Sequence, residues 1–175
     1  MELVTEHNHR MKVFHDILGC AFDVYNEFRP GLTEYPYQAG LRDLLIRLGY
    51  DVQKEYPLPI FLFGKQLEAN YRMDLVLHRE TSEGGDIIIE CKAKKCIIDE
   101  HRDQLKNYML LTHCPFGMLI NFCKDSKDNR VYSEAYEYDE AHHKVRKMNT
   151  RYIGMMYEKT EKPWQPFLDA KRRKE

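Results

Sequence analysis

The chain shows two kinds of hydrophobic pattern, one with the period of a helix and one with the period of a strand. Apolar residues recur at steps of three and four over residues 11–28, which predicts an amphipathic helix that ends at Arg29-Pro30-Gly31. A second helical stripe covers residues 33–48, with Thr33 as its N-cap and Gly49 after its last turn. A third predicts a helix over residues 99–112.

Extended segments lie between and after these helices. Residues 67–78 alternate between apolar and polar side chains, and residues 87–93 and 116–122 are mostly apolar, as in half-buried and fully buried strands respectively. Two further strands are predicted over residues 52–63 and 131–138. The pattern indicates an α/β fold with a central mixed sheet of four to five strands flanked by helices. We expect the first two helices on one face of this sheet and the third on the other.

A change in pattern divides the chain near residue 138. Residues 1–138 hold all the periodic segments, and 175 residues in total suit a single core. Residues 139–175 hold 10 basic and 6 acidic side chains and are expected to form a charged appendage packed on the same domain or extending it. The basic run over residues 171–174 is either a solvated terminus or an arm that contacts phosphates.

Composition excludes several classes of protein. Hydrophobic residues make up 43% of the chain and its net charge is −1, which excludes intrinsic disorder and the strongly basic composition of a bulk nucleic-acid binder. The chain has no apolar run of about 18 residues that would predict a membrane span, and its start lacks the pattern of a secretory signal. Its five cysteines are an odd number, typical of reduced thiols in a cytoplasmic protein.

Four charged residues stand where the pattern predicts burial. Glu34 lies on or beside the buried face of the second helix, and Asp74 interrupts the strand over residues 67–78. Glu90 and Lys92 share one face of the next strand. Charges in apolar strands are costly unless they are paired or bind something. Two carboxylates with a backbone carbonyl between them are suitable ligands for Mg²⁺, and an adjacent ammonium can stabilise charge at phosphorus. A salt bridge at a sheet end is the simpler interpretation of Glu90 and Lys92.

These residues resemble the signature of the PD-(D/E)XK nuclease superfamily, with its restriction-endonuclease-like core. The pattern consists of Asp74 followed by Glu90-Cys91-Lys92, and Met73 stands where the proline of the name would be. The stretch Gly31-Leu32-Thr33-Glu34-Tyr35-Pro36-Tyr37 is similar to the G-x-x-E-x-x-Y motif of one family within it. The resemblance extends over residues 31–122 and includes Leu119-Ile120-Asn121-Phe122.

The resemblance implies a role for each matching position. Asp74 and Glu90 would be metal ligands together with the Cys91 carbonyl, and Lys92 would position or activate the attacking water. Glu34 would reach the same site as an additional ligand or as an orienting group. The implied cofactor is Mg²⁺, with Mn²⁺ able to replace it.

The helix over residues 99–112 also carries part of this resemblance. Gln104 and Tyr108 resemble the Q-x-x-x-Y element of the RecB-like branch, and would position substrate or the lysine. The implied function is a metal-dependent nuclease acting on DNA. The alternative is a catalytically silent module with the same fold that binds nucleic acid or protein. DNA or RNA, endo- or exonuclease, and a homodimer or a protein partner all stay open.

Other candidate sites are weaker. The spacings of Cys91, Cys96, Cys114 and Cys123 match no common zinc or iron–sulfur pattern, and we expect the Cys91 thiol to point into the core. His101 precedes Gln104 by three residues on the same helix, and is either directed into the cleft or a structural, solvent-facing residue. The chain contains no glycine-rich phosphate loop and no G-x-S-x-G motif.

Overall fold

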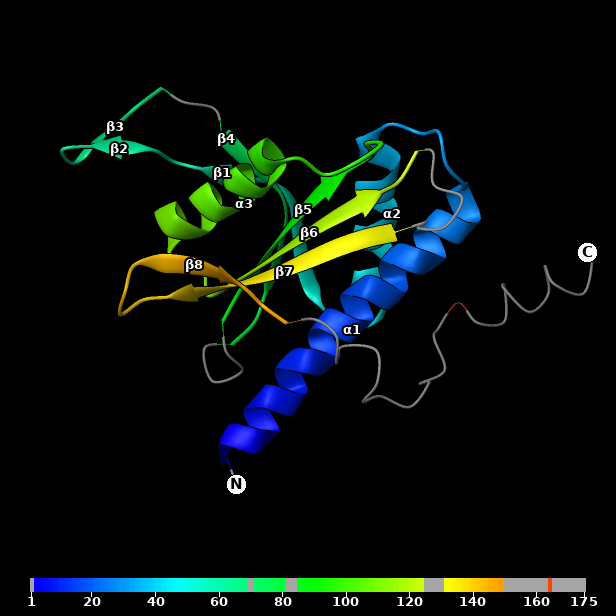
Figure 1. The fold of residues 1–175 in the computed structure, drawn as a ribbon, viewed down its shortest axis with the longest axis horizontal. Helices are drawn as coiled ribbons and strands as arrows, with labels where there is room; N and C mark the ends of the chain where they lie inside the picture. The colour runs from blue at the N-terminus through cyan, green and yellow to red at the C-terminus, as the bar shows by residue number, and fades with distance from the viewer. Residues whose placement is uncertain (1, 69–70, 81–84, 125–130, 150–163, 165–175) are drawn as a thin grey trace, which may run out of the picture.

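A computed structural model describes residues 2–68, 71–80, 85–124, 131–149 and 164, with side chains from residue 11 onward. Its main sheet has six strands in the order β1-β4-β5-β6-β7-β8, as Figure 1 shows. These strands are β1 (Asp51–Leu58), β4 (Tyr71–His78), β5 (Ile87–Lys92), β6 (Phe116–Phe122), β7 (Val131–Asp139) and β8 (Lys144–Lys147). A separate two-stranded hairpin is formed by β2 (Phe61–Leu62) and β3 (Lys65–Gln66).

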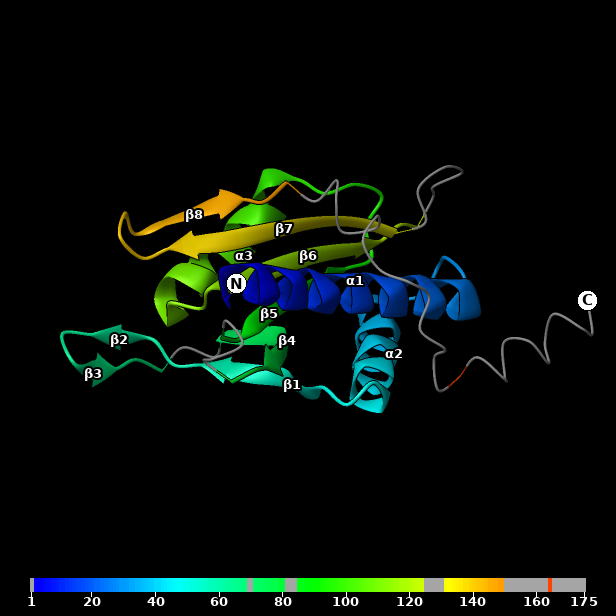
Figure 2. The ribbon, with the colours of Figure 1, turned by 90° about the horizontal axis from the view of Figure 1, so that it is seen from below.

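In the described residues, three helices cover the two faces of the sheet. Helices α1 (Glu2–Phe28) and α2 (Glu34–Arg47) pack on one face, and Figure 2 shows α1 lying along that face. Helix α3 (Asp99–Thr112) packs on the opposite face through Leu105, Tyr108 and Met109. The predicted α/β class and the placement of the helices are therefore confirmed.

The sheet contains one strand more than the predicted four to five. The additional strand, β8, pairs antiparallel with β7 and falls in the segment that the sequence left without pattern. Further along the same segment, Trp164 is buried and donates its indole N–H to Asp23 of α1 at 2.9 Å. The division at residue 138 stays a prediction, and the basic run over residues 171–174 lies outside the described residues.

The central strands β5 and β6 are parallel and are joined through α3. Every residue of both strands is buried, because helices cover both faces there. Parallel strands need such a crossover connection, and helices on both faces explain their nearly continuous hydrophobic sequences. Any charged side chain on β5 or β6 is therefore placed in the interior of the protein.

The residues of the G-x-x-E-x-x-Y stretch fix the start of α2 against the sheet. Gly31 has a positive φ of 116°, a conformation that favours glycine. Tyr37 is fully buried and stacks on Phe122 of β6 with ring centroids 4.5 Å apart. Its hydroxyl donates to the Arg29 carbonyl before the helix. Thr33 is the N-cap, although its side chain makes no capping hydrogen bond. These contacts set the position of Glu34, one turn before Tyr37.

A buried carboxylate holds α3 to the far edge of the sheet. Glu134 of β7 has a side chain that is 1% exposed and accepts paired hydrogen bonds from the Arg102 guanidinium of α3. Lys147 of β8 donates to the same carboxylate at 2.7 Å, and the hydroxyls of Tyr132 and Tyr136 also donate to it. Burial alone would raise the pKa of Glu134, but Arg102 and Lys147 outweigh it and hold the pKa well below its usual range.

We expect Glu134→Gln to lower the free energy of unfolding by about 3 kcal/mol at pH 7, because Arg102 loses its ionised partner. Since the native pKa of Glu134 is depressed, its stabilisation is complete above the unfolded value of about 4.3 and is lost as the pH falls further. Urea unfolding of both proteins between pH 7 and pH 3 should show the difference shrinking below about pH 4. Glu140→Gln, in an exposed turn, is the control. A difference that stays constant with pH would contradict the account.

The structure also bears on the state of the cysteines and on the length of the apolar helices. The described residues contain no disulfide, and four of the five cysteines are buried. Within the described residues, no helix is long and apolar enough to cross a membrane.

Candidate active site

The candidate site lies where β4 and β5 separate. Their antiparallel pairing covers only Leu75–Leu77 of β4 and Ile87–Ile89 of β5, although both strands continue past it. Beyond this point the Asp74 carboxylate takes the place of a backbone acceptor, because its Oδ2 accepts the Cys91 N–H at 2.8 Å. Strand β5 stays paired with β6 as far as Lys92. The opening therefore lies on the β4 side and contains Asp74.

The pairing of β4 with β1 is also interrupted at Asp74. The register is uniform on both sides, with Lys54 opposite Leu75 and Tyr56 opposite Met73, so Glu55 stands opposite Asp74. Glu55 has a φ of +54°, which is strained for a residue with a long side chain. Burial raises the pKa of Asp74, and the charges of Glu34 and Glu55 add to this rise. Glu55 is thus an acidic residue of the site that sequence reasoning missed.

Glu90 and Lys92 form an ion pair inside the protein. Glu90 is fully buried and Lys92 is 7% exposed, and Lys92 Nζ lies 2.6 Å from Glu90 Oε1. Burial first, and the Asp74 charge second, raise the pKa of Glu90 to about 7. Burial would lower the pKa of Lys92, but the Glu90 carboxylate raises it above its usual value. Lys92 is therefore an ammonium held in place by its neighbour.

Helix α3 supplies the second acceptor for this ammonium. Gln104 Oε1 accepts from Lys92 Nζ at 3.0 Å, and Gln104 Nε2 donates to the Tyr108 hydroxyl at 3.0 Å. The two α3 residues are four apart and so share one helical face. Two of the three donors of Lys92 are occupied by Glu90 and Gln104, and the third can donate to a substrate oxygen.

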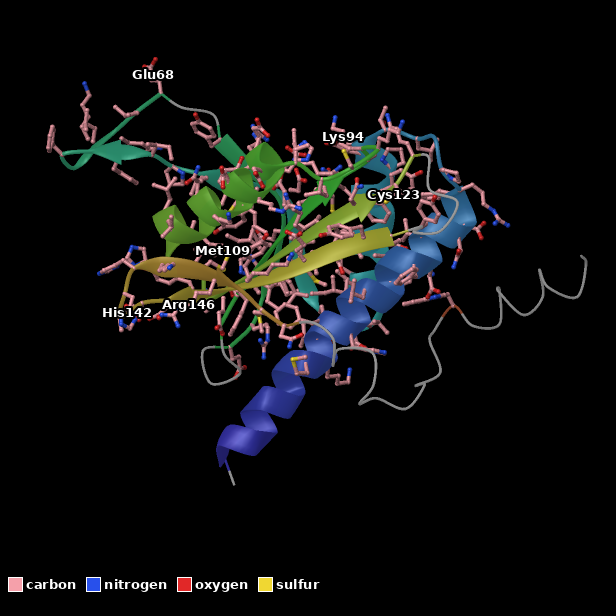
Figure 3. The ribbon with its side chains drawn as sticks, in the orientation of Figure 1. Glu68, Lys94, Met109, Cys123, His142 and Arg146 are labelled. Carbon is pink, nitrogen blue, oxygen red and sulfur yellow. The ribbon has the colours of Figure 1, made fainter. Side chains whose placement is uncertain are left out.

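Glu34 reaches the end of β5 from α2. Its Oε1 accepts from the Ala93 backbone N–H at 3.4 Å and lies 3.3 Å from Lys94 Nζ. Figure 3 shows Lys94 near the end of β5 that faces α2. Glu34 also raises the pKa values of Asp74 and Glu90 through its charge. Glu34 therefore lies near enough to Asp74 and Glu90 for its charge to affect them, and its direct contacts are with Ala93 and Lys94, the two residues after Lys92.

Asn121 braces the backbone that follows Lys92. It is fully buried on β6, where its Oδ1 accepts the Lys94 N–H at 2.9 Å and its Nδ2 donates to the Lys94 carbonyl at 3.1 Å. A paired side chain of this kind can replace the strand pairing that ends at Lys92. The matching segment of the sequence contained this residue, but periodicity gave it no role because it lies in an apolar run.

The donor set fits a hard divalent cation. Glu90 Oε2 is a buried carboxylate oxygen without a hydrogen-bond partner among the described residues, and such an oxygen is costly unless something binds it. Burial raises the pKa values of both Asp74 and Glu90, and the charge of Asp74 adds to the rise at Glu90. The structure describes no group of three or more His, Cys, Asp or Glu side chains arranged around a common point. Two carboxylates and a carbonyl nevertheless suit Mg²⁺, which keeps several water ligands.

Cys91 and His101, the other candidates from the sequence, occupy positions that the packing of the fold explains. The Cys91 side chain is fully buried in the core beneath α1 and α2, as expected. His101 accepts the Ile98 N–H at 3.3 Å at the start of α3. Burial, together with Lys92 and Lys94 nearby, lowers the pKa of His101. His101 is therefore close to the site as a neutral residue that caps the helix.

Comparison with known proteins identifies the class to which this fold and site belong. The family model described as PD-(D/E)XK nuclease superfamily matches residues 11–133, which is more than half of the chain. The protein belongs to the PD-(D/E)XK nuclease superfamily.

The remaining comparisons are less informative. The solved structure described as "Crystal structure of SSO0001" is similar at 21% identity and a TM-score of 0.42, over 61% of this chain and 52% of that one. The chain thus spans about half the length of that protein. No curated protein matches the chain.

We expect Asn121→Ala to destabilise the protein by about 1–3 kcal/mol, because it removes both hydrogen bonds to the Lys94 backbone. The Lys94 amide should exchange its hydrogen faster in the variant, which native-state hydrogen exchange can measure at that residue. Asn107→Ala, on the exposed surface of α3, should leave both quantities nearly unchanged. Unaltered exchange of the Lys94 amide in Asn121→Ala would contradict the bracing role.

Proposed function

We propose that this protein is a metal-dependent nuclease that hydrolyses phosphodiester bonds of DNA. The observation that carries the proposal is the convergence of Asp74, Glu90 and Lys92 where two central strands separate. One buried Glu90 oxygen there has no hydrogen-bond partner in the part of the chain that the structure describes. Membership of a nuclease superfamily supports the same chemistry.

Each residue of the site has a distinct part in this proposal. Asp74, Glu90 and the Cys91 carbonyl would hold Mg²⁺ or Mn²⁺, with Glu34 as an additional ligand or orienting group. When bound, the cation supplies a Lewis acid that polarises the phosphoryl oxygen. Lys92 orients the attacking water and stabilises the charge that develops at phosphorus, since its ammonium is fixed between Glu90 and Gln104. Gln104 and Tyr108 hold Lys92 in that direction and do not bind the metal.

Finer assignments belong to the same proposal. The contacts of Gly31, Glu34 and Tyr37 support the assignment to the G-x-x-E-x-x-Y family, because each motif residue has a structural reason to be there. DNA as the substrate, Mg²⁺ as the cofactor and a cytoplasmic location are also part of it, and the absence of a disulfide among the described residues supports that location. So is a domain over residues 1–138 with an appendage after it.

A second candidate function is a silent binding module with the nuclease fold. The observation in its favour is that the described residues contain no ready cage of three ligating side chains. The nuclease is preferred because all the acidic and lysine positions are present. The nuclease also gives a role to the buried Lys92 ammonium, which is held by two acceptors.

We expect the protein to cut DNA in Mg²⁺ or Mn²⁺ but not in EDTA, on linear, circular or single-stranded substrates. Lys92→Ala should lower the rate by about 10²–10³-fold, the usual effect of removing one electrostatic donor. Gel assays under single-turnover conditions would measure both rates.

Lys95→Ala is the matched control, because this exposed lysine lies three residues from Lys92 and should leave cleavage unchanged. Circular dichroism would verify that each variant is folded. Equal rates for Lys92→Ala and the parent protein would contradict the proposed role of Lys92. No cleavage of any substrate by a folded, metal-loaded protein would favour the silent module.

A further inference from the structure

An apolar pocket of about 610 Å³ lies beside the candidate site. One wall comes from the base of the β2–β3 hairpin, through Ile60 and Tyr71, and the other from α3, through Leu110 and Leu111. Tyr71 is 54% exposed and Leu111 is 56% exposed. Figures 1 and 2 show the hairpin projecting from the sheet on the same side of the molecule as α3.

The pocket is continuous with the catalytic residues. Gln104 and Tyr108 line it, and Gln104 is the residue that accepts from Lys92 at 3.0 Å. A group bound in the pocket would therefore lie close to the phosphate on which Lys92 acts. Asn107, also in the lining, offers an amide donor and acceptor beside these two side chains.

The tip of the hairpin carries Phe63, whose backbone conformation is unfavourable for this residue type. Leu62 pairs with Lys65, so the turn consists of Phe63 and Gly64, with φ values of 48° and 81°. Such two-residue turns favour Asn-Gly or Gly-Gly, because both positions need a positive φ. Phe63 is instead strained and completely solvent-exposed. A strained, exposed aromatic residue is a sign of a contact made by the surface rather than of folding.

We propose that the pocket and the hairpin bind unpaired nucleobases of the substrate strand, with one base stacked on Tyr71 and bases further along the strand on the hairpin aromatics Phe61 and Phe63. This inference rests on the proposed function, because it takes the substrate to be a nucleic acid. Stacking on aromatic rings is how proteins hold single strands without reading their sequence.

The chemistry of the surface matches this occupant. Exposed Phe61, Phe63 and Tyr71 supply flat faces, and Gln104 and Asn107 supply polar groups for a base edge at the inner end. Lys65 and Arg72 are exposed and adjoin Gly64 and Tyr71 in the chain, where they can meet the phosphates of the same strand. A base in a duplex would have to leave its stack to enter, so the protein should prefer single-stranded DNA or frayed ends.

Fluorescence anisotropy with a labelled 20-nucleotide oligo(dT) and with a hairpin duplex, both in EDTA so that no strand is cut, tests the proposal. Tyr71→Ala should weaken oligo(dT) binding about tenfold, the effect of losing one stacked base, while Tyr71→Phe keeps the ring and the affinity. Phe63→Asn should weaken binding and at the same time raise thermal stability, because Asn suits the turn. Phe22→Ala removes an exposed aromatic from α1 on the other face and is the control.

The outcomes separate this inference from the proposed function. If the parent protein cuts DNA but Tyr71→Ala binds oligo(dT) as tightly as the parent, the stacking site is wrong and the nuclease stands. If oligo(dT) binding falls in Tyr71→Ala but no substrate is ever cut, the stacking site stands and the nuclease is wrong. If sedimentation shows a dimer that Phe63→Asn dissociates while oligo(dT) binding is unchanged, the surface binds a second copy and the inference is overturned.

Discussion

The hydrogen bond between the Cys91 N–H and the Asp74 carboxylate is the interaction on which the rest of the site depends. A backbone N–H in the middle of a buried strand must have a partner, and β4 stops providing one beyond Leu75. Asp74 satisfies it with a side chain, which holds the two strands apart without leaving a buried donor unpaired. The separation is what allows a polar site to exist inside a sheet whose strands are otherwise covered on both faces.

The charges gathered at this separation are unfavourable on their own. Asp74, Glu90, Glu34 and Glu55 place several negative charges near one lysine. Burial first, and these neighbouring charges second, raise the pKa values of Asp74 and Glu90. Lys92 offsets part of this repulsion through its 2.6 Å contact with Glu90. A divalent cation would offset the remainder, so the same feature that costs stability in the free protein favours metal binding. Tyr37 and Asn121 give the site its rigidity. Tyr37 fixes the chain on both sides of Glu34 through Phe122 and the Arg29 carbonyl, and Asn121 fixes it just after Lys92.

Much of this arrangement could be predicted from the sequence. Hydrophobic periodicity predicts the boundaries of α2, α3, β5 and β6 to within about a residue or two, the accuracy normal for element boundaries. These elements are predictable because they are long or strongly buried. Glu34, Asp74, Glu90 and Lys92 were recognisable as charges in apolar surroundings and through the superfamily pattern.

The remaining features depend on three-dimensional neighbours that no local pattern encodes. Glu55 joins the site only because the register of β1 places it opposite Asp74, and its positive φ is invisible in the sequence. The buried Glu134 is explained by partners from three different elements. Strand β8 has exposed, mostly basic residues and so shows no hydrophobic alternation. The pocket beside Tyr71 exists only because α3 and the hairpin come together in space.

The measurement that tests the account most directly is an anomalous difference map from crystals grown with Mn²⁺. We expect a peak coordinated by the Asp74 and Glu90 carboxylates and the Cys91 carbonyl, at Mn–O distances of about 2.2 Å. The peak should be absent in crystals of Glu90→Gln. A map without a peak at the separation of β4 and β5, or with the ion bound elsewhere, would contradict the claim that this separation is a metal-dependent catalytic site.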